Sequence, residues 1–226
     1  MAAKRQRPTS NKRQPKAVAN GGARTPEPSA PERSVCVYCG SGPGAKPIYA
    51  EAARQLGHGL AAAGIGLVYG GGGMGLMGEV ARATLDGGGH VTGIIPKFLI
   101  EKEHALTNAS ELIVTADMHE RKKLMFDRSD AFVALPGGIG TLEELVEQLT
   151  WSQIGHHCKP IGIVNTGGYW DKFIALLQHM RQEEFIRPGL EVAVLIDNDP
   201  CNLVDNLLHC INRTSPSASL STFRFF

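Results

Sequence analysis

Residues 131–144 read AFVALPGGIGTLEE, and this stretch decides the fold. It begins with five apolar residues, turns at Pro136 and the glycines that follow, and continues with leucine and glutamate. An apolar run of this length that ends at a Pro-Gly pair is typical of a strand buried on both faces. The residues from Thr141 onward favour a helix. The stretch therefore predicts a strand, a tight turn and a helix in succession, the repeating unit of an α/β protein.

The same alternation of short β-branched runs and longer helical patterns extends from Ser34 to about His209. It predicts one Rossmann-like, doubly wound parallel sheet of about seven strands, with helices on both faces. Ligands in such a fold bind beyond the carboxyl ends of the strands, where the strand order reverses. The predicted strands are Val35–Cys39, Ile65–Tyr69, His90–Ile95, Glu111–Thr115, Ala131–Leu135, Pro160–Asn165 and Val192–Ile196, and the predicted helices are Pro47–Ala63, Leu76–Asp86, Met118–Arg128, Thr141–Ser152, Tyr169–Glu183 and Cys201–His209.

Composition divides the chain into three parts. Residues 1–33 form a basic segment rich in Pro and Ser without apolar periodicity, so we expect disorder there. The folded domain is expected at residues 34–211, followed by a C-terminal tail at residues 212–226. The first 34 residues carry eight of the 23 Lys and Arg and two of the 22 Asp and Glu, which leaves a net charge of −5 on the remainder.

An acidic body argues against nucleic acid as a partner, because a nucleic-acid binder needs a basic face for the phosphates. No apolar run reaches the ~20 residues of a membrane span, so we expect no membrane association. These features predict a soluble, cytoplasmic protein, and they leave nuclear or organellar targeting by the basic segment open.

The five cysteines are scattered and do not suggest a disulfide framework. Cys36 and Cys39 lie three residues apart on a predicted strand, which places them on opposite faces of the sheet and prevents them from sharing a metal or a disulfide. The sequence from His156 to Cys158 is rich in metal-binding side chains, but no second cluster at zinc spacing accompanies it. We therefore expect no metal site.

Four consecutive glycines, Gly70 to Gly73, follow the second predicted strand. Such a loop can bring backbone amides and a helix N-terminus toward an anion, although a tight turn without a ligand explains one such loop equally well. The candidate phosphate-binding residues at this edge of the sheet are Ser41, Gly71, Gly72, Gly73 and Gly75.

A dinucleotide site is the competing interpretation, because Gly73, Gly75 and Gly78 satisfy the G-x-G-x-x-G pattern. That pattern needs an acidic residue at the end of the next strand to bind the ribose, and residues 90–97 contain none. An NAD site is therefore disfavoured. A Walker A loop is excluded, since no Gly-Lys pair precedes a Ser or Thr.

The second glycine loop, Pro136 to Thr141, opens a helix that carries Glu143, Glu144 and Glu147. Carboxylates near a helix N-terminus can simply stabilise the helix dipole. A carboxylate beside a bound phosphate is repelled, however, which favours a chemical role for at least one of them. Since adjacent helical residues diverge by about 100°, only one of Glu143 and Glu144 can face the loop squarely.

Arg121 lies in the segment DMHERKK, residues 117–123, at the start of the preceding predicted helix. That helix opens at the same edge of the sheet, so the Arg121 guanidinium could reach a phosphate or a ribose there. A solvated charged face is the alternative.

Taken together, these residues resemble the LOG family, the cytokinin riboside 5′-monophosphate phosphoribohydrolases, which are often mislabelled as lysine decarboxylases. The similarity covers Ser34 to about His209. Its markers are Cys39-Gly40-Ser41, Tyr69-Gly70-Gly71-Gly72, Gly75-Leu76-Met77-Gly78, Ile95-Pro96-Lys97, residues 116–122, and the signature P-G-G-x-G-T-x-x-E at Pro136 to Glu144.

The resemblance implies hydrolysis of the N-glycosidic bond of a cytokinin or adenine riboside 5′-monophosphate, with release of the free base and ribose 5-phosphate. It implies a homodimer that binds a purine nucleoside 5′-monophosphate and needs neither a cofactor nor a metal. By position, Arg121 and Glu144 match the catalytic pair of the family. The positions that match substrate contacts are Glu103, Arg121, Lys122, Gly137, Gly138, Ile139, Gly140, Thr141, Leu142, Glu143 and Thr150.

The implied roles are physically sensible. Glycosidic cleavage passes through an oxocarbenium-like state, so the Glu144 carboxylate could stabilise the developing positive charge or activate water. Arg121 would hold the phosphate or ribose in place. The chain differs from the plant pattern at Gly42, at residues 98–102 and at Ile139, where plant members often have Tyr, and these differences bear on which base is released. The alternative function is a non-catalytic purine nucleotide sensor, to which the Glu144 carboxylate would contribute little.

Overall fold

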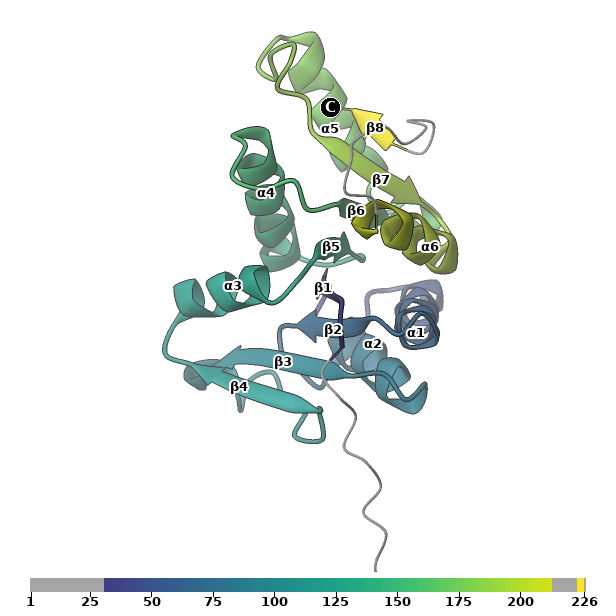
Figure 1. The fold of residues 1–226 in the computed structure, drawn as a ribbon, viewed down its shortest axis with the longest axis vertical. Helices are drawn as coiled ribbons and strands as arrows, with labels where there is room; N and C mark the ends of the chain where they lie inside the picture. The colour runs from purple at the N-terminus through teal and green to yellow at the C-terminus, as the bar shows by residue number, and fades with distance from the viewer. Residues whose placement is uncertain (1–30, 213–222, 226) are drawn as a thin grey trace, which may run out of the picture.

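The computed structural model describes residues 31–212 and 223–225, which form one eight-stranded sheet in the order β4-β3-β2-β1-β5-β6-β7-β8 (Figure 1). The first seven strands run parallel, as predicted, and β8 is antiparallel to β7. The predicted disorder of residues 1–33 falls almost entirely outside the described residues. The strands are β1 Ser34–Tyr38, β2 Gly66–Tyr69, β3 Val91–Pro96, β4 Glu111–Thr115, β5 Ala131–Ala134, β6 Ile161–Val164, β7 Ala193–Asp197 and β8 Phe223–Phe225.

The strand order reverses at the centre of the sheet. Strands β1 to β4 build outward in one direction, and the chain then returns so that β5 lies against the other side of β1. The switch point is therefore the pair of carboxyl ends at Tyr38 and Ala134, where a doubly wound fold is expected to bind its ligand.

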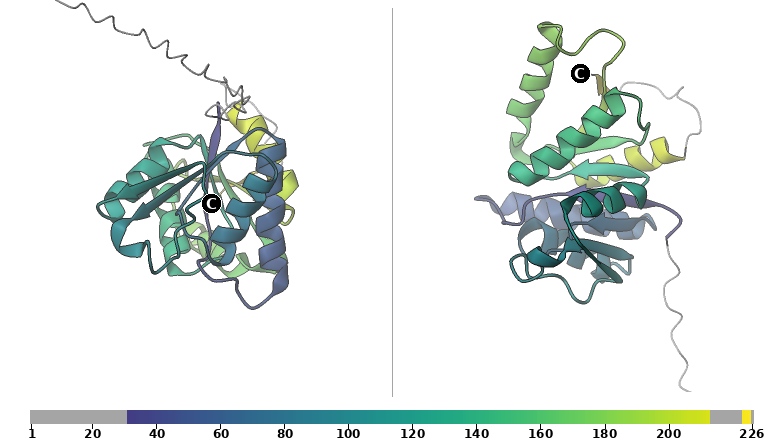
Figure 2. Two further views of the ribbon diagram at one scale, coloured as in Figure 1. Left: turned by 90° about the horizontal axis from the view of Figure 1, so that it is seen from below. Right: turned by 90° about the vertical axis from the view of Figure 1, so that its left-hand side faces the viewer.

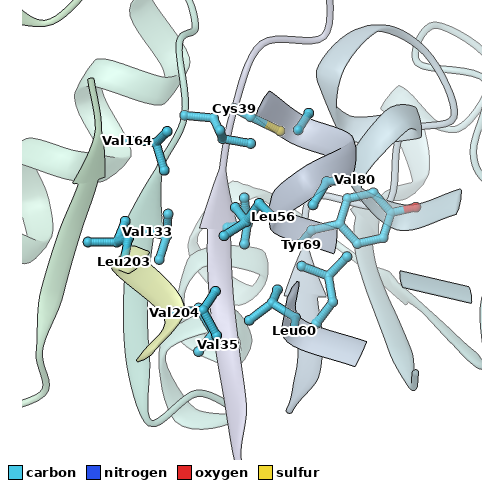
Figure 3. Packing of buried hydrophobic residues seen from close by; sticks show 14 of the residues in the cluster. Val35, Cys39, Leu56, Leu60, Tyr69, Val80, Val133, Val164, Leu203 and Val204 are labelled. Carbon is cyan, nitrogen blue, oxygen red and sulfur yellow. The ribbon is translucent and has the colours of Figure 1, made fainter. Parts of the chain in front are cut away.

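Helices cover both faces of the sheet, as predicted (Figure 2). One core cluster joins the sheet to α1, α2 and α6, and a second joins its other face to α3, α4 and α5. Figure 3 shows the first cluster, in which Leu60 of α1 and Val204 of α6 lie close to Val35 of β1. The helices are α1 Pro47–Ala62, α2 Gly75–Asp86, α3 Met118–Asp127, α4 Ile139–Gln153, α5 Asp171–Gln182 and α6 Pro200–Ile211, with short 3₁₀ turns at η1 Lys97–Leu99 and η2 Thr166–Gly168.

Strand β1 is buried on both faces, because its side chains alternate between the two clusters. Val35 and Val37 belong to the first cluster, while Cys36 and Tyr38 belong to the second. Cys39 returns to the first. The prediction that Cys36 and Cys39 point to opposite faces is thus confirmed, and both thiols are free and buried.

Local chemistry sets the start of α3. The Asp117 side chain accepts hydrogen bonds from the amides of His119 and Glu120, both at 2.9 Å. The Glu120 carboxylate reaches back to the amide of Ala116 at 2.7 Å, one residue before its usual partner in a capping box. The predicted cap is therefore present in a slightly extended form, and it fixes the turn from which Arg121 projects.

Two boundaries differ from the prediction in ways that matter. Helix α4 begins at Ile139, two residues before the predicted start at Thr141, because Gly138 serves as its N-cap in an extended conformation. The segment predicted as a C-terminal tail contains β8, which pairs with the edge strand β7. Among the described residues, the helices lack the length and hydropathy that crossing a bilayer requires.

The contact between α1 and α2 yields a stability prediction. A methyl group on Gly57 would lie 2.8 Å from the Ala83 Cβ and 3.0 Å from the Thr84 amide, so Gly57→Ala should lower the free energy of unfolding by about 1–3 kcal/mol. Gly59→Ala is the matched control, because its Cβ would lie 3.5 Å from Val204 and should gain up to about 1 kcal/mol of helix propensity. Urea denaturation compares the two variants, and equal stability would contradict the close packing.

Candidate functional site

A pocket of about 340 Å³ opens at the switch point, beyond the carboxyl ends of β1 and β5. The start of α3, the start of α4 and the segment after β3 complete its wall. The residues that line it are Val37, Tyr38, Cys39, Gly40, Ser41, Gly70, Met77, Leu99, Glu103, Met118, Arg121, Met125, Gly138, Ile139, Gly140, Thr141, Glu143 and Glu144.

The N-terminus of α4 presents free backbone amides to this pocket. Within the described part of the chain, no group accepts a hydrogen bond from the amides of Ile139, Gly140 or Thr141. Gly137 has no room for a side chain, because Thr141 folds back against it. Three unpaired amides and the positive end of a 15-residue helix suit an anion such as phosphate.

Arg121 is buried beneath the pocket, with only 6% of its surface exposed. Its Nη2 donates to the Gly70 carbonyl at 3.0 Å, and its Nη1 lies 3.7 Å from the Met118 sulfur. The Nε atom is buried without a protein partner. A side chain on Gly70 would overlap the guanidinium, so this glycine makes space for Arg121. The guanidinium is therefore held in place while some of its N–H groups are still available to a ligand.

Glu144 is a partly buried carboxyl group in the pocket wall. Burial raises the pKa of Glu144 to about 7, and the nearby Arg121 opposes this effect. The negative charges of Glu143 and Glu103 raise the same pKa further, whereas Lys122 lowers it. A carboxyl group that titrates near neutral pH can both hold and release a proton under cellular conditions, as acid–base catalysis requires.

Glu143 also lines the pocket, but its surroundings differ from those of Glu144. Its side chain is 53% exposed, and its carboxylate binds Lys122 at 2.6 Å. Lys122 makes a second ion pair with Glu147 at 2.9 Å. Burial lowers the pKa of Lys122, yet the two hydrogen bonds outweigh burial and leave that pKa raised. Of the two adjacent glutamates, Glu144 is thus the one in a perturbed, buried setting.

Glu103 is the third carboxyl group of the pocket, on the segment after η1. Its Oε2 atom is buried without a hydrogen-bond partner and lies 4.0 Å from Arg121 Nη2. Burial raises the pKa of Glu103, and Arg121 lowers it by a smaller amount. Glu103, Arg121 and Glu144 therefore form one interacting group of charges.

The first glycine loop lies mostly outside this pocket and makes backbone contacts within the chain. Gly73 donates its amide to the carbonyls of Glu103 and His104, and the Gly71 carbonyl accepts from the Leu106 amide. Gly75 packs against the backbone at Ser41 and Gly42. Of the five candidates, only Ser41 lines the pocket, whereas Gly71, Gly72, Gly73 and Gly75 do not.

The structure brings most of the predicted site together. Arg121, Glu144 and Glu103 line the pocket, as do four residues of the α4 turn and Glu143. Thr150 lies instead in an apolar groove between α4 and α5, more than two helical turns beyond Thr141. The predicted substrate contacts Lys122, Gly137 and Leu142 adjoin the pocket without lining it.

The sequence interpretation missed the apolar part of the wall. Met118 and Met125 lie three residues before and four residues after Arg121, so they occupy the same face of α3. That spacing was a usable signal. Met77 and Leu99 come from α2 and η1, and no local pattern places them beside Arg121.

The region from His156 to Cys158 is structural. The His157 ring is buried, with Nδ1 accepting from the Lys159 amide at 3.1 Å and Nε2 paired with the Gln148 carbonyl at 3.2 Å. Both ring nitrogens are therefore occupied. No group of three or more potential metal-binding side chains occurs among the described residues.

The sequence matches one protein family and several plant proteins. A family model described as "Possible lysine decarboxylase" matches residues 77–207. The chain is 46% identical over 175 residues to a protein of Oryza sativa subsp. japonica named probable cytokinin riboside 5′-monophosphate phosphoribohydrolase LOGL2, covering 77% of this chain and 72% of that protein. It is 50% identical over 156 residues to cytokinin riboside 5′-monophosphate phosphoribohydrolase LOG3 of Arabidopsis thaliana, covering 69% of this chain and 73% of the relative.

Two solved structures share the fold. A molybdenum cofactor binding protein from Rippkaea orientalis matches with a TM-score of 0.60 and 24% identity, over 80% of this chain and 98% of that chain. The Moco carrier protein from Chlamydomonas reinhardtii matches with a TM-score of 0.59 and 22% identity, over 79% and 98% of the two chains. At these identities the similarity shows the fold alone.

The raised pKa of Glu144 predicts a pH-dependent effect on stability. The folded state holds this proton more tightly than the unfolded chain does, so stability falls as pH rises from the ordinary pKa of 4.5 to about 7. Glu144→Gln removes this penalty and should raise the free energy of unfolding at pH 8 by on the order of 2–3 kcal/mol.

At pH 4 the same substitution should have little effect, because the carboxyl is then neutral in both states. Urea denaturation at the two pH values measures the difference. An equal change in the free energy of unfolding at both pH values would show that ionised Glu144 does not destabilise the folded state.

Proposed function

The chain belongs to the possible lysine decarboxylase family, as do the cytokinin riboside 5′-monophosphate phosphoribohydrolases, and from this premise we propose that it is a nucleotide N-glycosidase. It hydrolyses an adenine-type riboside 5′-monophosphate, with or without a prenyl group on the base, to the free base and ribose 5-phosphate. The observation that carries this proposal is the meeting of three features in one pocket: an unpaired helix N-terminus, the Arg121 guanidinium and the Glu144 carboxyl.

The N-terminus of α4 binds the 5′-phosphate. The amides of Ile139, Gly140 and Thr141 point their hydrogens at the same anion, and the helix dipole adds to their attraction. Because these donors belong to the backbone, they are already in place before the substrate arrives. The nucleotide is thereby oriented with its sugar toward the deeper part of the pocket.

Arg121 orients the substrate. Its guanidinium is anchored on the Gly70 carbonyl, and its buried Nε still has an N–H to donate. Because a cation beside the forming ribosyl cation would be unfavourable, these donors serve the phosphate or ribose oxygens. The contribution of Arg121 is thus to hold the reacting bond in a fixed position.

Glu144 carries out the chemical step. As a carboxylate it stabilises positive charge that develops at the anomeric carbon and accepts a proton from the attacking water. With a pKa of about 7, a large fraction of Glu144 is ionised at neutral pH. Its carboxylate is then also a stronger base than that of an ordinary glutamate, and it attracts the proton of water more strongly. The oxygen of water bonds to the anomeric carbon, and the electrons of the broken C–N bond leave with the base. The base takes up one proton and Glu144 gives up the one it accepted from water, so that the carboxylate is restored.

The residues of the pocket do not fit a decarboxylase that uses pyridoxal phosphate, in spite of the family description. Such an enzyme needs a lysine in the site to form a Schiff base. None of the residues that line this pocket is a lysine. The nearby Lys122 is held by Glu143 and Glu147.

The protein forms a homodimer in this proposal, through the apolar groove between α4 and α5. Thr150 lines this groove together with side chains such as Val146, Leu176 and Phe185, which are 41%, 47% and 84% exposed. A patch of this kind on a single chain is typical of a protein interface. Its position on α4 would place the second subunit near the pocket.

An assay for free base tests the proposed reaction. The protein is incubated with AMP and with isopentenyladenosine 5′-monophosphate, and the products are separated by chromatography. We expect free base from at least one of them. Release from neither, in a protein that still binds AMP, would point to a nucleotide sensor instead.

Glu144→Gln should lower turnover at least ~10³-fold and retain substrate binding, because the amide keeps the shape of the side chain but cannot carry the charge. Glu143→Gln is the matched comparison, and we expect its turnover to stay within ~10-fold of wild type, since Glu143 is exposed and tied to Lys122. The reverse order of the two effects would assign the catalytic role to Glu143.

The rate should also depend on pH in a defined direction. Because Glu144 acts as the carboxylate, kcat is expected to rise as pH increases through about 7 and then level off. The rate is measured at saturating substrate, so that it reports the ionisation of the enzyme–substrate complex. A rate that falls across the same interval would mean that Glu144 acts as an acid.

A further inference from the structure

We propose that Tyr169 is a positioning residue for the phosphate site. Its hydroxyl fixes the peptide between Gly137 and Gly138, so that the Gly138 amide points into the pocket. Tyr169 acts here on the turn that binds the 5′-phosphate, so the inference rests on the proposed function. The tyrosine comes from the segment between β6 and α5 and does not line the pocket, so it acts through the turn and not on the substrate.

The Tyr169 hydroxyl bonds to the turn that precedes α4. It donates a hydrogen bond to the Gly137 carbonyl, 32 residues away in sequence. The preceding carbonyl, that of Pro136, accepts a hydrogen bond from the Gly40 amide at 3.1 Å. Both carbonyls of the turn are thus held by parts of the chain that are distant in sequence.

A hydrogen bond to a carbonyl also sets the direction of the next amide. The peptide bonds of the described residues are trans, and in a trans peptide the C=O and the following N–H point in opposite directions. Since the Gly137 carbonyl points toward Tyr169, the Gly138 N–H points away from it. Gly138 lines the pocket and Tyr169 does not, so this N–H faces the ligand side of the turn.

The turn does not hold this orientation by itself. The peptide lies between two glycines, so it can rotate at a lower cost than a peptide between residues with side chains. A Cβ on Gly138 would meet nothing within 4 Å, which shows that packing does not fix it. Its amide has no acceptor among the described residues and is available to an anion. The Tyr169 hydroxyl therefore supplies the constraint that Gly137 and Gly138 lack.

Two aromatic neighbours hold the ring of Tyr169. Its centroid lies 5.6 Å from that of Tyr49 on α1 and 5.1 Å from that of Trp170, and both contacts are edge-to-face. Tyr49 and Trp170 are themselves buried. The hydroxyl thus belongs to a ring with restricted freedom, as a positioning role requires.

Two glycines shape the backbone just before this tyrosine. Gly167 and Gly168 have φ values of 62° and 70°, in the left-handed region that favours glycine. Asn165 closes the segment, because its Oδ1 accepts from the Trp170 amide at 2.8 Å and its Nδ2 donates to Asp171 at 2.7 Å. The segment is therefore shaped to present the tyrosine ring in one place.

Removal of the hydroxyl tests the positioning role. Calorimetry measures binding in the Glu144→Gln background, where hydrolysis is too slow to disturb the measurement. We define phosphate preference as the Kd for adenosine divided by the Kd for AMP. Tyr169→Phe should lower this preference roughly 3- to 10-fold, the effect of about one hydrogen bond, and should leave the Kd for adenosine unchanged. With Glu144 present, Tyr169→Phe should lower kcat/KM for AMP by a similar factor.

Tyr49→Phe is the matched control. It removes the same group from the neighbouring ring, whereas the hydroxyl that reaches the turn belongs to Tyr169. Its phosphate preference should equal that of the parent protein. An equal loss in both variants would assign the effect to aromatic packing and overturn the role of the hydroxyl. Thermal unfolding of each variant confirms that it is folded.

The outcomes separate the two proposals. If wild type releases no base from AMP, the proposed reaction fails, and the ratio of Kd values still tests Tyr169. If Tyr169→Phe keeps the phosphate preference, or weakens AMP and adenosine equally, the positioning role is overturned. If the parent protein binds AMP no more tightly than adenosine, the turn does not bind the phosphate, and the positioning role is overturned as well.

Discussion

The hydrogen bond between the buried guanidinium of Arg121 and the carbonyl of Gly70 is the contact on which the site depends. This contact holds the positively charged guanidinium of Arg121, a residue of α3, beneath the switch point. The strands themselves offer only backbone and apolar side chains there. That charge makes it tolerable to bury Glu103 and Glu144 in the same pocket, because without it both carboxyl groups would be harder to ionise. This arrangement requires glycine at position 70, because a side chain there would overlap the Arg121 guanidinium.

Much of the fold could be predicted from the sequence. Short β-branched runs and helical patterns gave the seven parallel strands to within two residues, since buried strands and amphipathic helices have distinct periodicities. Strand β8 could not be found in this way. Its three residues form a strand through pairing with the edge of β7, and such pairing depends on tertiary structure.

The site was harder to predict where contacts join distant parts of the chain. Gly71–Gly73 look in sequence like a phosphate loop, because a glycine run after a strand permits close approach of any partner. The structure shows that the partner is the chain itself, some thirty residues later, at Glu103 and His104. By contrast, the turn at Gly138 and the carboxyl at Glu144 belong to one local strand-turn-helix unit, and the sequence placed both in the pocket.

The start of α4 at Ile139 has a consequence for the length of the ligand. The amides that are proposed to bind the phosphate belong to the same helix as Glu144, which lies four residues, or ~6 Å of helical rise, after Gly140. A helix is stiff over this distance, so the spacing between the phosphate and the reacting carbon cannot adjust. In the proposed binding mode, one phosphate group would bring the sugar level with Glu144, whereas the terminal phosphate of a diphosphate or triphosphate at the same amides would leave the glycosidic bond out of reach. Under the proposed function, the geometry of a single helix would thus favour nucleoside monophosphates over diphosphates and triphosphates.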